Sequence, residues 1–232
     1  MSFTGSTEVG RELITKSAAQ VKRITLELGG NAPYIVFADA DMDKAVDQLM
    51  ANKFRGSGQT CVCANRILVE RPVAAEFSRR LTARVNALRL GDGLDDATDI
   101  GPLVDRAGYE KVRHHLIDAM AKGAQLVTGA PAGALPQLDK EWGGFFPPTV
   151  ISGVNRSMAC WNEEIFGPLV SIAEFDDDND ALLKANDTEY GLAAYVFTQD
   201  AARAERFVDA LHFQHVAWNT GTGPAPEAPF GG

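Results

Sequence analysis

Residues 24–54 of this 232-residue chain read ITLELGGNAPYIVFADADMDKAVDQLMANKF. The apolar run Ile24–Leu28 predicts a strand that a double glycine ends, and Pro33–Phe37 predicts a second, fully apolar strand. Hydrophobic residues then recur at helical spacing over Asp41–Phe54, and an aspartate stands near the start of that helix. Two strands followed by an amphipathic helix indicate a sheet that helices cover, so the sequence predicts the α/β fold class.

The same alternation of strands and helices extends on both sides of this stretch. Further helices are predicted over Thr7–Val21, Ala74–Leu88, Asp105–Lys122, Asn179–Asn186 and Ala201–Leu211. Further strands are predicted over Arg66–Val69, Gln125–Thr128, Pro148–Ile151, Val170–Phe175, Ala193–Thr198 and His215–Trp218. Gly129–Gly144, rich in glycine, alanine and proline, is expected to be a surface loop.

The composition excludes several classes of function. The formal net charge is −9 at pH 7, which argues against nucleic acid and anionic membrane as partners. The longest apolar runs are far shorter than the roughly 20 residues that span a bilayer. The first residues lack the features of a signal peptide, so we expect a cytoplasmic protein. Three cysteines, an odd number, argue against a disulfide framework and leave reduced thiols for chemistry.

One cysteine stands where a nucleophile would be delivered. Residues 54–63 read FRGSGQTCVC, so a predicted helix runs into a loop with two glycines that ends at Cys61. Glycines let the backbone approach a ligand, and main-chain N–H groups there could stabilise an oxyanion. A buried structural cysteine is an equally good interpretation of this pattern by itself.

A carboxylate is the second candidate. Glu27 lies in an otherwise apolar strand beside the double glycine, and a plain solvent-facing residue is the simpler interpretation of that strand. Between apolar walls, however, a carboxylate would have a raised pKa and could act as a general base. The pairing with Cys61 makes the second interpretation attractive.

Two further motifs could bind parts of a nucleotide. GSTEVG, residues 5–10, opens a predicted helix, and helix N-termini bind phosphate, although any serine-capped helix looks like this. EEIFGP, residues 163–168, could offer a carboxylate to hydroxyl groups and a ring for stacking, or could be a solvated loop with a core phenylalanine.

A metal site is not expected. His114 and His115 are adjacent on a predicted helix and therefore point apart, and His212 and His215 have no cysteine partners nearby.

Taken together, the motifs resemble those of the aldehyde dehydrogenase superfamily, in the same order along the chain. The residues that carry the resemblance are FTGSTEVG (3–10), LELGGN (26–31), GQTC (58–61), EEIFGP (163–168) and PFGG (229–232). They span essentially the whole chain, and several ordered motifs are far more specific than any one of them.

The resemblance implies a fold and a domain division. Residues 29–232 would form an aldehyde dehydrogenase-like catalytic domain, a sheet with helices on both faces, truncated at its C-terminal end. Residues 1–28 would be a remnant of a Rossmann-type cofactor domain. Family members are much longer, and full-length relatives are expected to be homo-oligomers. A second hypothesis is therefore a truncated, catalytically inactive product that does not bind the cofactor.

The resemblance also implies the roles of individual residues. Cys61 would attack a small-molecule aldehyde, with NAD or NADP as the cofactor, and its main-chain N–H would form half of an oxyanion hole. Glu27 would activate water to hydrolyse the resulting thioester. The cofactor would contact Gly5, Ser6, Thr7, Val9, Gly10, Glu164 and Phe166.

The segment GQTCVCANR, residues 58–66, looks most like succinate-semialdehyde and glutarate-semialdehyde dehydrogenases. That likeness implies that Arg55 binds the distal carboxylate of the substrate, since guanidinium and carboxylate pair well. It also implies a redox-regulatory disulfide between Cys63 and Cys61. Relatives carry a serine shortly before PFGG that helps to hold the carboxylate, and residues 223–228 of this chain contain none. The choice between NAD and NADP, the aldehyde and the oligomeric state stay open.

Overall fold

The computed structural model describes residues 1–131, 133, 135, 144–223, 227–228 and 230. Most of the expected loop Gly129–Gly144 and part of the PFGG motif therefore lie outside the described residues. Within them, seven strands form one sheet in the order β5-β6-β7-β4-β3-β8-β9. Neighbouring strands run parallel, except for the antiparallel pair β5 and β6. Their bounds are Ala32–Val36 (β3), Ala64–Glu70 (β4), Gln125–Thr128 (β5), Thr149–Ser152 (β6), Leu169–Phe175 (β7), Ala193–Phe197 (β8) and His215–Trp218 (β9).

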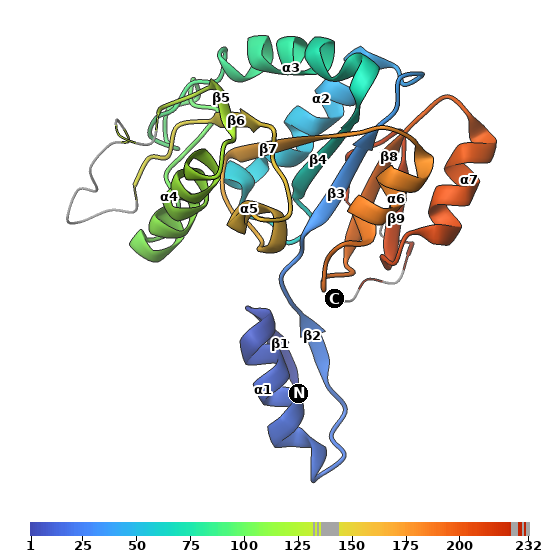
Figure 1. Cartoon of the computed structure of the whole chain (residues 1–232). Helices are drawn as coiled ribbons and strands as arrows, with labels where there is room; N and C mark the ends of the chain where they lie inside the picture. Colours follow the sequence, from blue (N-terminus) through green and yellow to red (C-terminus); the bar gives the residue numbers. More distant parts are fainter. Residues whose placement is uncertain (132, 134, 136–143, 224–226, 229, 231–232) are drawn as a thin grey trace.

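Helices cover both faces of this sheet (Figure 1), which confirms the predicted fold class. One face packs against α2 (Met42–Lys53) and α3 (Arg71–Val85). The other face packs against α4 (Arg106–Ala121), α5 (Ala159–Asn162), α6 (Asp178–Asn186) and α7 (Ala201–Ala210). No described helix has the length and apolar character needed to cross a membrane.

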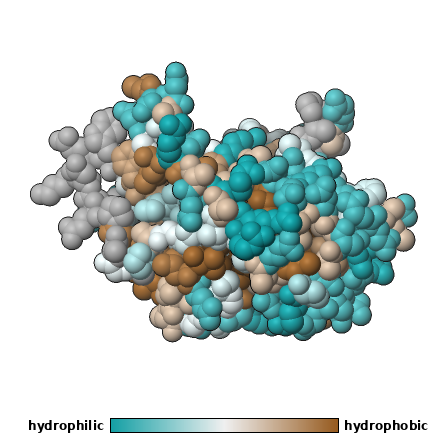
Figure 2. All heavy atoms as spheres, turned by 90° about the horizontal axis from the view of Figure 1, so that it is seen from above, coloured by the Kyte–Doolittle hydropathy of each residue, from teal (hydrophilic) through white to brown (hydrophobic). Residues whose placement is uncertain are grey.

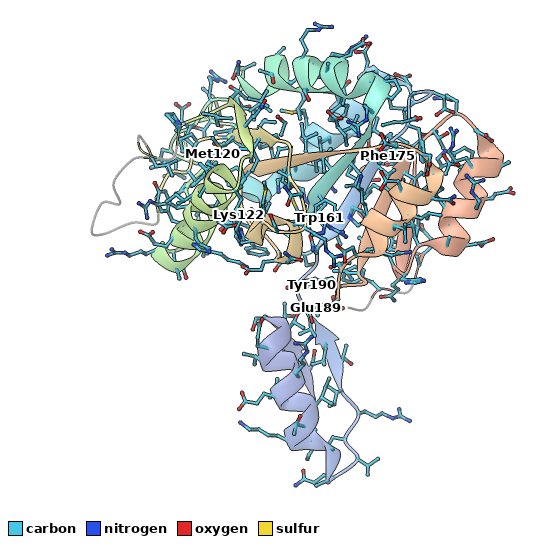
Figure 3. The ribbon with its side chains drawn as sticks, in the orientation of Figure 1. Met120, Lys122, Trp161, Phe175, Glu189 and Tyr190 are labelled. Atoms are coloured by element: carbon cyan, nitrogen blue, oxygen red, sulfur yellow. The ribbon has the colours of Figure 1, made fainter. Side chains whose placement is uncertain are left out.

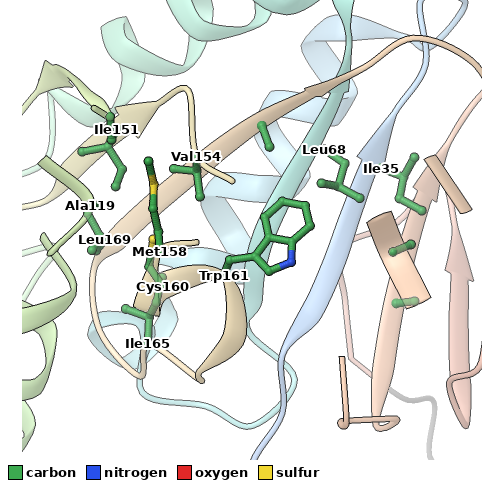
Figure 4. Packing of buried hydrophobic residues seen from close by; sticks show 14 of the residues in the cluster. Ile35, Leu68, Ala119, Ile151, Val154, Met158, Cys160, Trp161, Ile165 and Leu169 are labelled. Carbon is green, nitrogen blue, oxygen red and sulfur yellow. The ribbon is translucent and has the colours of Figure 1, made fainter. Parts of the chain in front are cut away.

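The hydrophobic core is divided by the sheet into two clusters, because successive strand side chains point to opposite faces. In β3 and just after it, Ile35 and Phe37 join the cluster under α4–α7, whereas Tyr34 and Val36 join the cluster under α2 and α3. Figure 4 shows the first cluster, in which Trp161 lies near the central strands. Burial of each such large side chain contributes about 1.5–3 kcal/mol. Much of the outer face on the α3 side is hydrophilic, with separate hydrophobic patches (Figure 2).

The N-terminal residues form a small unit of their own, which projects from the main body (Figure 1). It consists of β1 (Ser2–Thr4), α1 (Thr7–Ala18) and β2 (Thr25–Glu27), and the two strands pair in parallel. An ion pair between Arg11 and Glu189 links it to the main body at the junction seen in Figure 3. The unit ends at Glu27, close to the domain boundary expected after residue 28, and that domain division stays a prediction.

Several elements differ from the sequence prediction. Residues 2–4 form β1, for which no strand was predicted, and the Thr25 N–H at the start of β2 donates to the Met1 carbonyl. Three residues are too few to display an alternating pattern. The first helix ends at Ala18, and α3 begins at Arg71 because proline is tolerated in a first helical turn. The short α5 and the 3-10 helix η1 (Arg55–Gly58) were not predicted.

Candidate active site

A cleft of about 970 Å³ lies where the N-terminal unit meets the main body. Residues predicted from distant parts of the sequence line it together: Gly5, Ser6, Glu27, Arg55, Cys61, Glu164 and Phe166. Thr7, Val9, Gly10 and Cys63 are not among its lining residues. The fold therefore brings most of the candidate site into one cavity.

Two glycines allow the loops of the cleft to touch. A Cβ atom on Gly30 would lie 2.0 Å from the Cys61 carbonyl oxygen, so the loop after β2 and the cysteine loop are in backbone contact. Gly58 has a φ of +78°, and a Cβ there would lie 2.3 Å from the Gly167 carbonyl oxygen. The sequence suggested that Gly56 and Gly58 admit a ligand, whereas Gly58 admits a neighbouring loop, as Gly30 does.

The buried side-chain amide of Asn52 holds the loop that carries Cys61. Asn52, at the end of α2, donates from Nδ2 to the Gly221 carbonyl (2.8 Å) and accepts at Oδ1 from the Ala64 N–H (2.6 Å). The Tyr195 hydroxyl donates to the Val62 carbonyl at 2.6 Å. Cys61 is therefore followed by two anchored residues. The Val62 carbonyl is bonded to Tyr195 on β8, and the Ala64 N–H is bonded to Asn52 on α2. Sequence reasoning missed Asn52, because a single amide in an amphipathic helix carries no signal.

A second amide, Asn65, holds the carboxylate loops together. Its Nδ2 donates to Asn31 Oδ1 (2.7 Å) and to the Glu163 carbonyl (3.0 Å), and its Oδ1 accepts from the Ile165 N–H (2.8 Å). These bonds tie the segment after Glu27 to the segment that carries Glu164. Sequence reasoning missed this residue also.

The neighbouring Arg66 is only 1 % exposed, and its partners are backbone carbonyls. It donates to the carbonyls of Asn31, Lys184 and Ala185 at 2.7–3.3 Å, and so joins the Asn31 loop to the end of α6. Burial lowers the pKa of Arg66 to about 10.

The thiol of Cys61 is in an environment that disfavours its charge. Burial raises the pKa of the Cys61 thiol, and the carboxylates of Glu164 and Glu27 raise it further. Burial also raises the pKa of Glu164, and the Gly30 N–H, which donates to its Oε1 at 2.9 Å, opposes that shift. Glu27 Oε2 is buried and makes no hydrogen bond with a described residue. A thiol and two carboxylates therefore share one cavity.

Two cations also line the cleft. Arg55 follows the end of α2, and Lys111 lies on α4 one turn after Gly108, which lines the cleft as well. Within the described residues neither side chain forms an ion pair, although the charge of Lys111 acts to lower the pKa of Glu8 and of Glu164. Both are thus available to an anion. Lys111 was missed, because the sequence presents it as an ordinary polar residue of a covering helix.

The residues at the start of α1, which were expected to bind the cofactor, differ from one another in exposure and in what they contact. Ser6 caps α1, its Oγ accepting from the Val9 N–H at 3.4 Å, while Thr7 is the first residue of the helix. Val9 is 40 % exposed. Gly10 is buried, and a Cβ there would lie 2.7 Å from Leu28 Cδ2, so Gly10 allows α1 to pack closely on the chain after β2.

The other two thiols do not line the cleft. Cys63 is 6 % exposed, with its Sγ 3.7 Å from the Lys53 carbonyl oxygen, and burial raises its pKa. Burial raises the pKa of Cys160 to about 12. All three cysteines are free, so the regulatory disulfide between Cys61 and Cys63 stays a prediction.

The histidines do not assemble a metal site. His115 is buried and bonds through Nε2 to Glu163 Oε2 at 2.9 Å. Among the residues that the structure describes, no group of three or more His, Cys, Asp or Glu side chains could hold a metal ion.

Known proteins resemble this chain along its whole length. It is 47% identical to the NADP(+) succinate-semialdehyde dehydrogenase of Escherichia coli and 45% identical to the glutarate-semialdehyde dehydrogenase of Pseudomonas putida, covering 100% of this chain and 47% of each relative. A crystal structure of an oxidoreductase from Marinobacter aquaeolei is 58% identical with a TM-score of 0.95, covering 99% of this chain and 47% of that one. The chain thus spans about half the length of these relatives. The model of the aldehyde dehydrogenase family matches residues 1–232, which confirms the resemblance in the sequence: the chain belongs to the aldehyde dehydrogenase family.

Proposed function

We propose that this chain carries the nucleophile, the general base and the substrate-carboxylate site for oxidation of a semialdehyde acid to a dicarboxylate with NAD(P)+. The observation that carries the proposal is the cleft in which Cys61 and Glu27 lie with Arg55, a guanidinium without an acidic partner among the described residues. A free guanidinium beside a nucleophile favours a substrate with an anionic group at the end opposite its carbonyl. Relatives named for succinate and glutarate semialdehydes agree with this substrate class.

The first step is covalent addition. The sulfur of Cys61 attacks the aldehyde carbon, a C–S bond forms, and the thiol proton ends on the former carbonyl oxygen. The Cys61 N–H forms no hydrogen bond with another described residue, so it is available to the oxyanion that develops there. Because the pKa of the thiol is raised, little thiolate exists at neutral pH.

The second step is hydrolysis of the thioester. Glu27 lies in the same cleft with a buried oxygen that no described residue uses, and it takes a proton from the attacking water. The C–S bond then breaks, and the thiol of Cys61 is restored. Glu27 in this role acts after oxidation and not before it.

The residues present fit a dinucleotide. Ser6 at the start of α1 and the unpaired Lys111 offer an anion site at one end of the cleft, suited to the phosphates. The carboxylate of Glu164, oriented by the Gly30 N–H, would hold the ribose hydroxyls, and Phe166 would pack at the nicotinamide end. When bound, the nicotinamide supplies the acceptor for the hydride of the substrate. Whether the adenosine carries a 2′-phosphate stays open.

Kinetics of the complete gene product that carries these residues test the proposal. Arg55→Gln should raise KM for succinate semialdehyde about tenfold to a hundredfold, as expected for loss of a charged hydrogen bond, and leave KM for butanal nearly unchanged. Arg79→Gln, on the exposed face of α3, is the matched control. Equal changes for both aldehydes would contradict the assigned substrate class.

The roles of Cys61 and Glu27 separate in a rapid-mixing experiment. Cys61→Ala should abolish formation of reduced nicotinamide, because the covalent route is lost. Glu27→Gln should retain a burst of reduced nicotinamide and then turn over slowly, because the thioester waits for water. Loss of the burst in Glu27→Gln, with cofactor binding intact, would instead assign Glu27 to activation of Cys61.

A second candidate is a catalytically inactive product without cofactor binding. It is favoured by the N-terminal unit, which holds only two strands and one helix of a dinucleotide-binding sheet. So few contacts offset little of the entropy that is lost when a flexible cofactor is held in place. The 232-residue chain by itself should then give no heat of NAD(P)+ binding in calorimetry. Tight binding and turnover by that chain would reject this candidate.

A further inference from the structure

The two adjacent histidines of α4 lie in different environments. His114 is exposed, whereas His115 is fully buried and bonds through Nε2 to Glu163 Oε2 at 2.9 Å. A carboxylate only accepts hydrogen bonds, so Nε2 carries the proton of the ring and donates it. Burial lowers the pKa of His115, although the carboxylate opposes that shift, so the ring is neutral at neutral pH and Nδ1 carries no proton.

The other ring nitrogen of His115 gains nothing from the fold. Nδ1 is buried and has no hydrogen-bond partner among the described residues. A buried polar atom without a partner costs free energy, which an apolar side chain would avoid. Val112 and Leu116 on the same helix belong to the hydrophobic core, so leucine would suit the position of His115. Packing alone therefore does not explain a histidine here, and the bond to Glu163 is its distinguishing contact.

That bond joins two elements that both border the main cleft. On α4, Lys111 lies one turn before His115 and lines the cleft. On the other side of the bond, Glu163 is followed by Glu164 and Phe166, which line the cleft as well. Burial raises the pKa of Glu164 and the charge of Lys111 opposes that shift, so the two charges act on one another.

Residues 163–167 have a conformation that neighbouring elements must maintain. Phe166 has a φ of +56°, in the left-handed region that a residue with a side chain rarely adopts. Such a conformation persists only where the surrounding contacts hold it. A Cβ atom on Gly167 would lie 2.4 Å from Val112 Cγ2, so α4 touches this segment there also. Because His115 bonds Glu163, α4 contacts the segment near both of its ends.

We propose that His115 is a positioning residue, whose bond to Glu163 fixes the ribose-binding carboxylate of Glu164 relative to α4. This inference rests on the proposed cofactor site. His115 does not line the cleft, so it acts through residues 163–167 and not on the reacting atoms. Without the bond, the segment can relax, and the ribose hydroxyls lose a partner that is held in place before the cofactor arrives.

Hydrogen exchange followed by mass spectrometry tests the positioning on the 232-residue chain without cofactor. His115→Leu removes the donor, and Glu163→Ala removes the acceptor at an exposed position. Each should speed exchange of the amides of residues 165–167 about tenfold, because a hydrogen bond to a charged group is lost. His115→Leu should nevertheless leave the midpoint of thermal unfolding nearly unchanged, since the unpartnered Nδ1 is lost with the bond. Unchanged exchange in both variants would overturn the proposal, and a lowered midpoint with unchanged exchange would give His115 a purely structural role.

Conservative variants and a neighbouring histidine serve as controls. His115→Gln places an amide N–H near the position of Nε2, and Glu163→Gln keeps a carbonyl oxygen as acceptor. Both should exchange more slowly than the variants that remove the bond. His114→Leu, at the exposed neighbouring position, is the matched control and should change nothing. An equal effect of His114→Leu would overturn the proposal, because the exchange would then depend on the helix and not on the bond.

Fluorescence titration of the complete gene product with NADH and with NADPH tests the consequence for the cofactor. His115→Leu should raise Kd for the nucleotide about tenfold and leave KM for the aldehyde nearly unchanged, and His115→Gln should restore much of the affinity. An unchanged Kd in His115→Leu would overturn the role at the cofactor site, even if exchange is faster. A wild-type protein that binds neither nucleotide would instead overturn the proposed cofactor site, and the exchange experiment would still decide whether the bond holds the segment.

Discussion

Replacement of Asn52 by leucine should destabilise the chain and loosen the cysteine loop. Asn52 is 8 % exposed, and leucine keeps its approximate shape while it removes both polar groups. Two short bonds are lost, from Nδ2 to the Gly221 carbonyl at 2.8 Å and from the Ala64 N–H to Oδ1 at 2.6 Å. A buried backbone group left without a partner costs about 1–3 kcal/mol. Ala64 N–H has no access to water because Ala64 is fully buried, and Gly221 is buried as well. We therefore expect a loss of about 3 kcal/mol in the free energy of unfolding.

Urea unfolding followed by circular dichroism measures this loss. With an m value of about 3 kcal/mol/M, at the upper end for small proteins because m grows with chain length, the midpoint should fall by about 1 M. Asn179→Leu, at an exposed position in α6, is the matched control and should change stability by at most about 0.5 kcal/mol. A midpoint of Asn52→Leu indistinguishable from that of the control would refute the assigned clamp. The same variant should also alkylate faster at Cys61, since the cysteine loop loses its attachment at Ala64.

Three further predictions follow from the site. The alkylation rate of Cys61 should rise with pH around a midpoint above that of a free cysteine peptide, because the pKa of Cys61 is raised and the thiolate forms only at higher pH. Glu164→Gln should lower that midpoint, and a wild-type midpoint below that of the peptide would contradict the assigned electrostatics. Gly30→Ala should displace the cysteine loop, since the new Cβ would lie 2.0 Å from the Cys61 carbonyl oxygen; thermal unfolding should show a large loss of stability, and an unchanged midpoint would disprove the contact. Cys63→Ala should keep most of the alkylation of Cys61 but lose sensitivity to mild oxidants, which a comparison of peptide masses before and after peroxide can check, with Cys160→Ala as the buried-thiol control.

Much of the architecture could be predicted from residue patterns. The apolar runs that became β3, β7 and β8 and the amphipathic repeat that became α2 are strong local signals, because strands buried on both faces and half-buried helices differ in period. Ordered motifs around Cys61 and Glu164 identified the family without coordinates. Local patterns were too weak for β1, which is three residues long and exists through its pairing with β2.

The set of residues that lines the cleft could be known only from the tertiary structure. Sequence reasoning named Arg55 as a carboxylate-binding residue only through family likeness, whereas the fold places its guanidinium in the same cleft as Cys61 without an ion-pair partner among the described residues. Lys111 carries no motif, and it becomes a candidate anion-binding residue because of the cavity that it lines.

The sequence by itself determined most of the element types, the family and the candidate nucleophile, since these depend on residues close together in the chain. The tertiary structure alone decided which side chains hold the site in shape. Asn52 joins residues 64 and 221, and Asn65 joins residues 31, 163 and 165. A buried amide is satisfied by whatever backbone the fold brings to it, and that backbone lies far away along the chain. No local pattern can therefore distinguish such a residue from an amide that faces water.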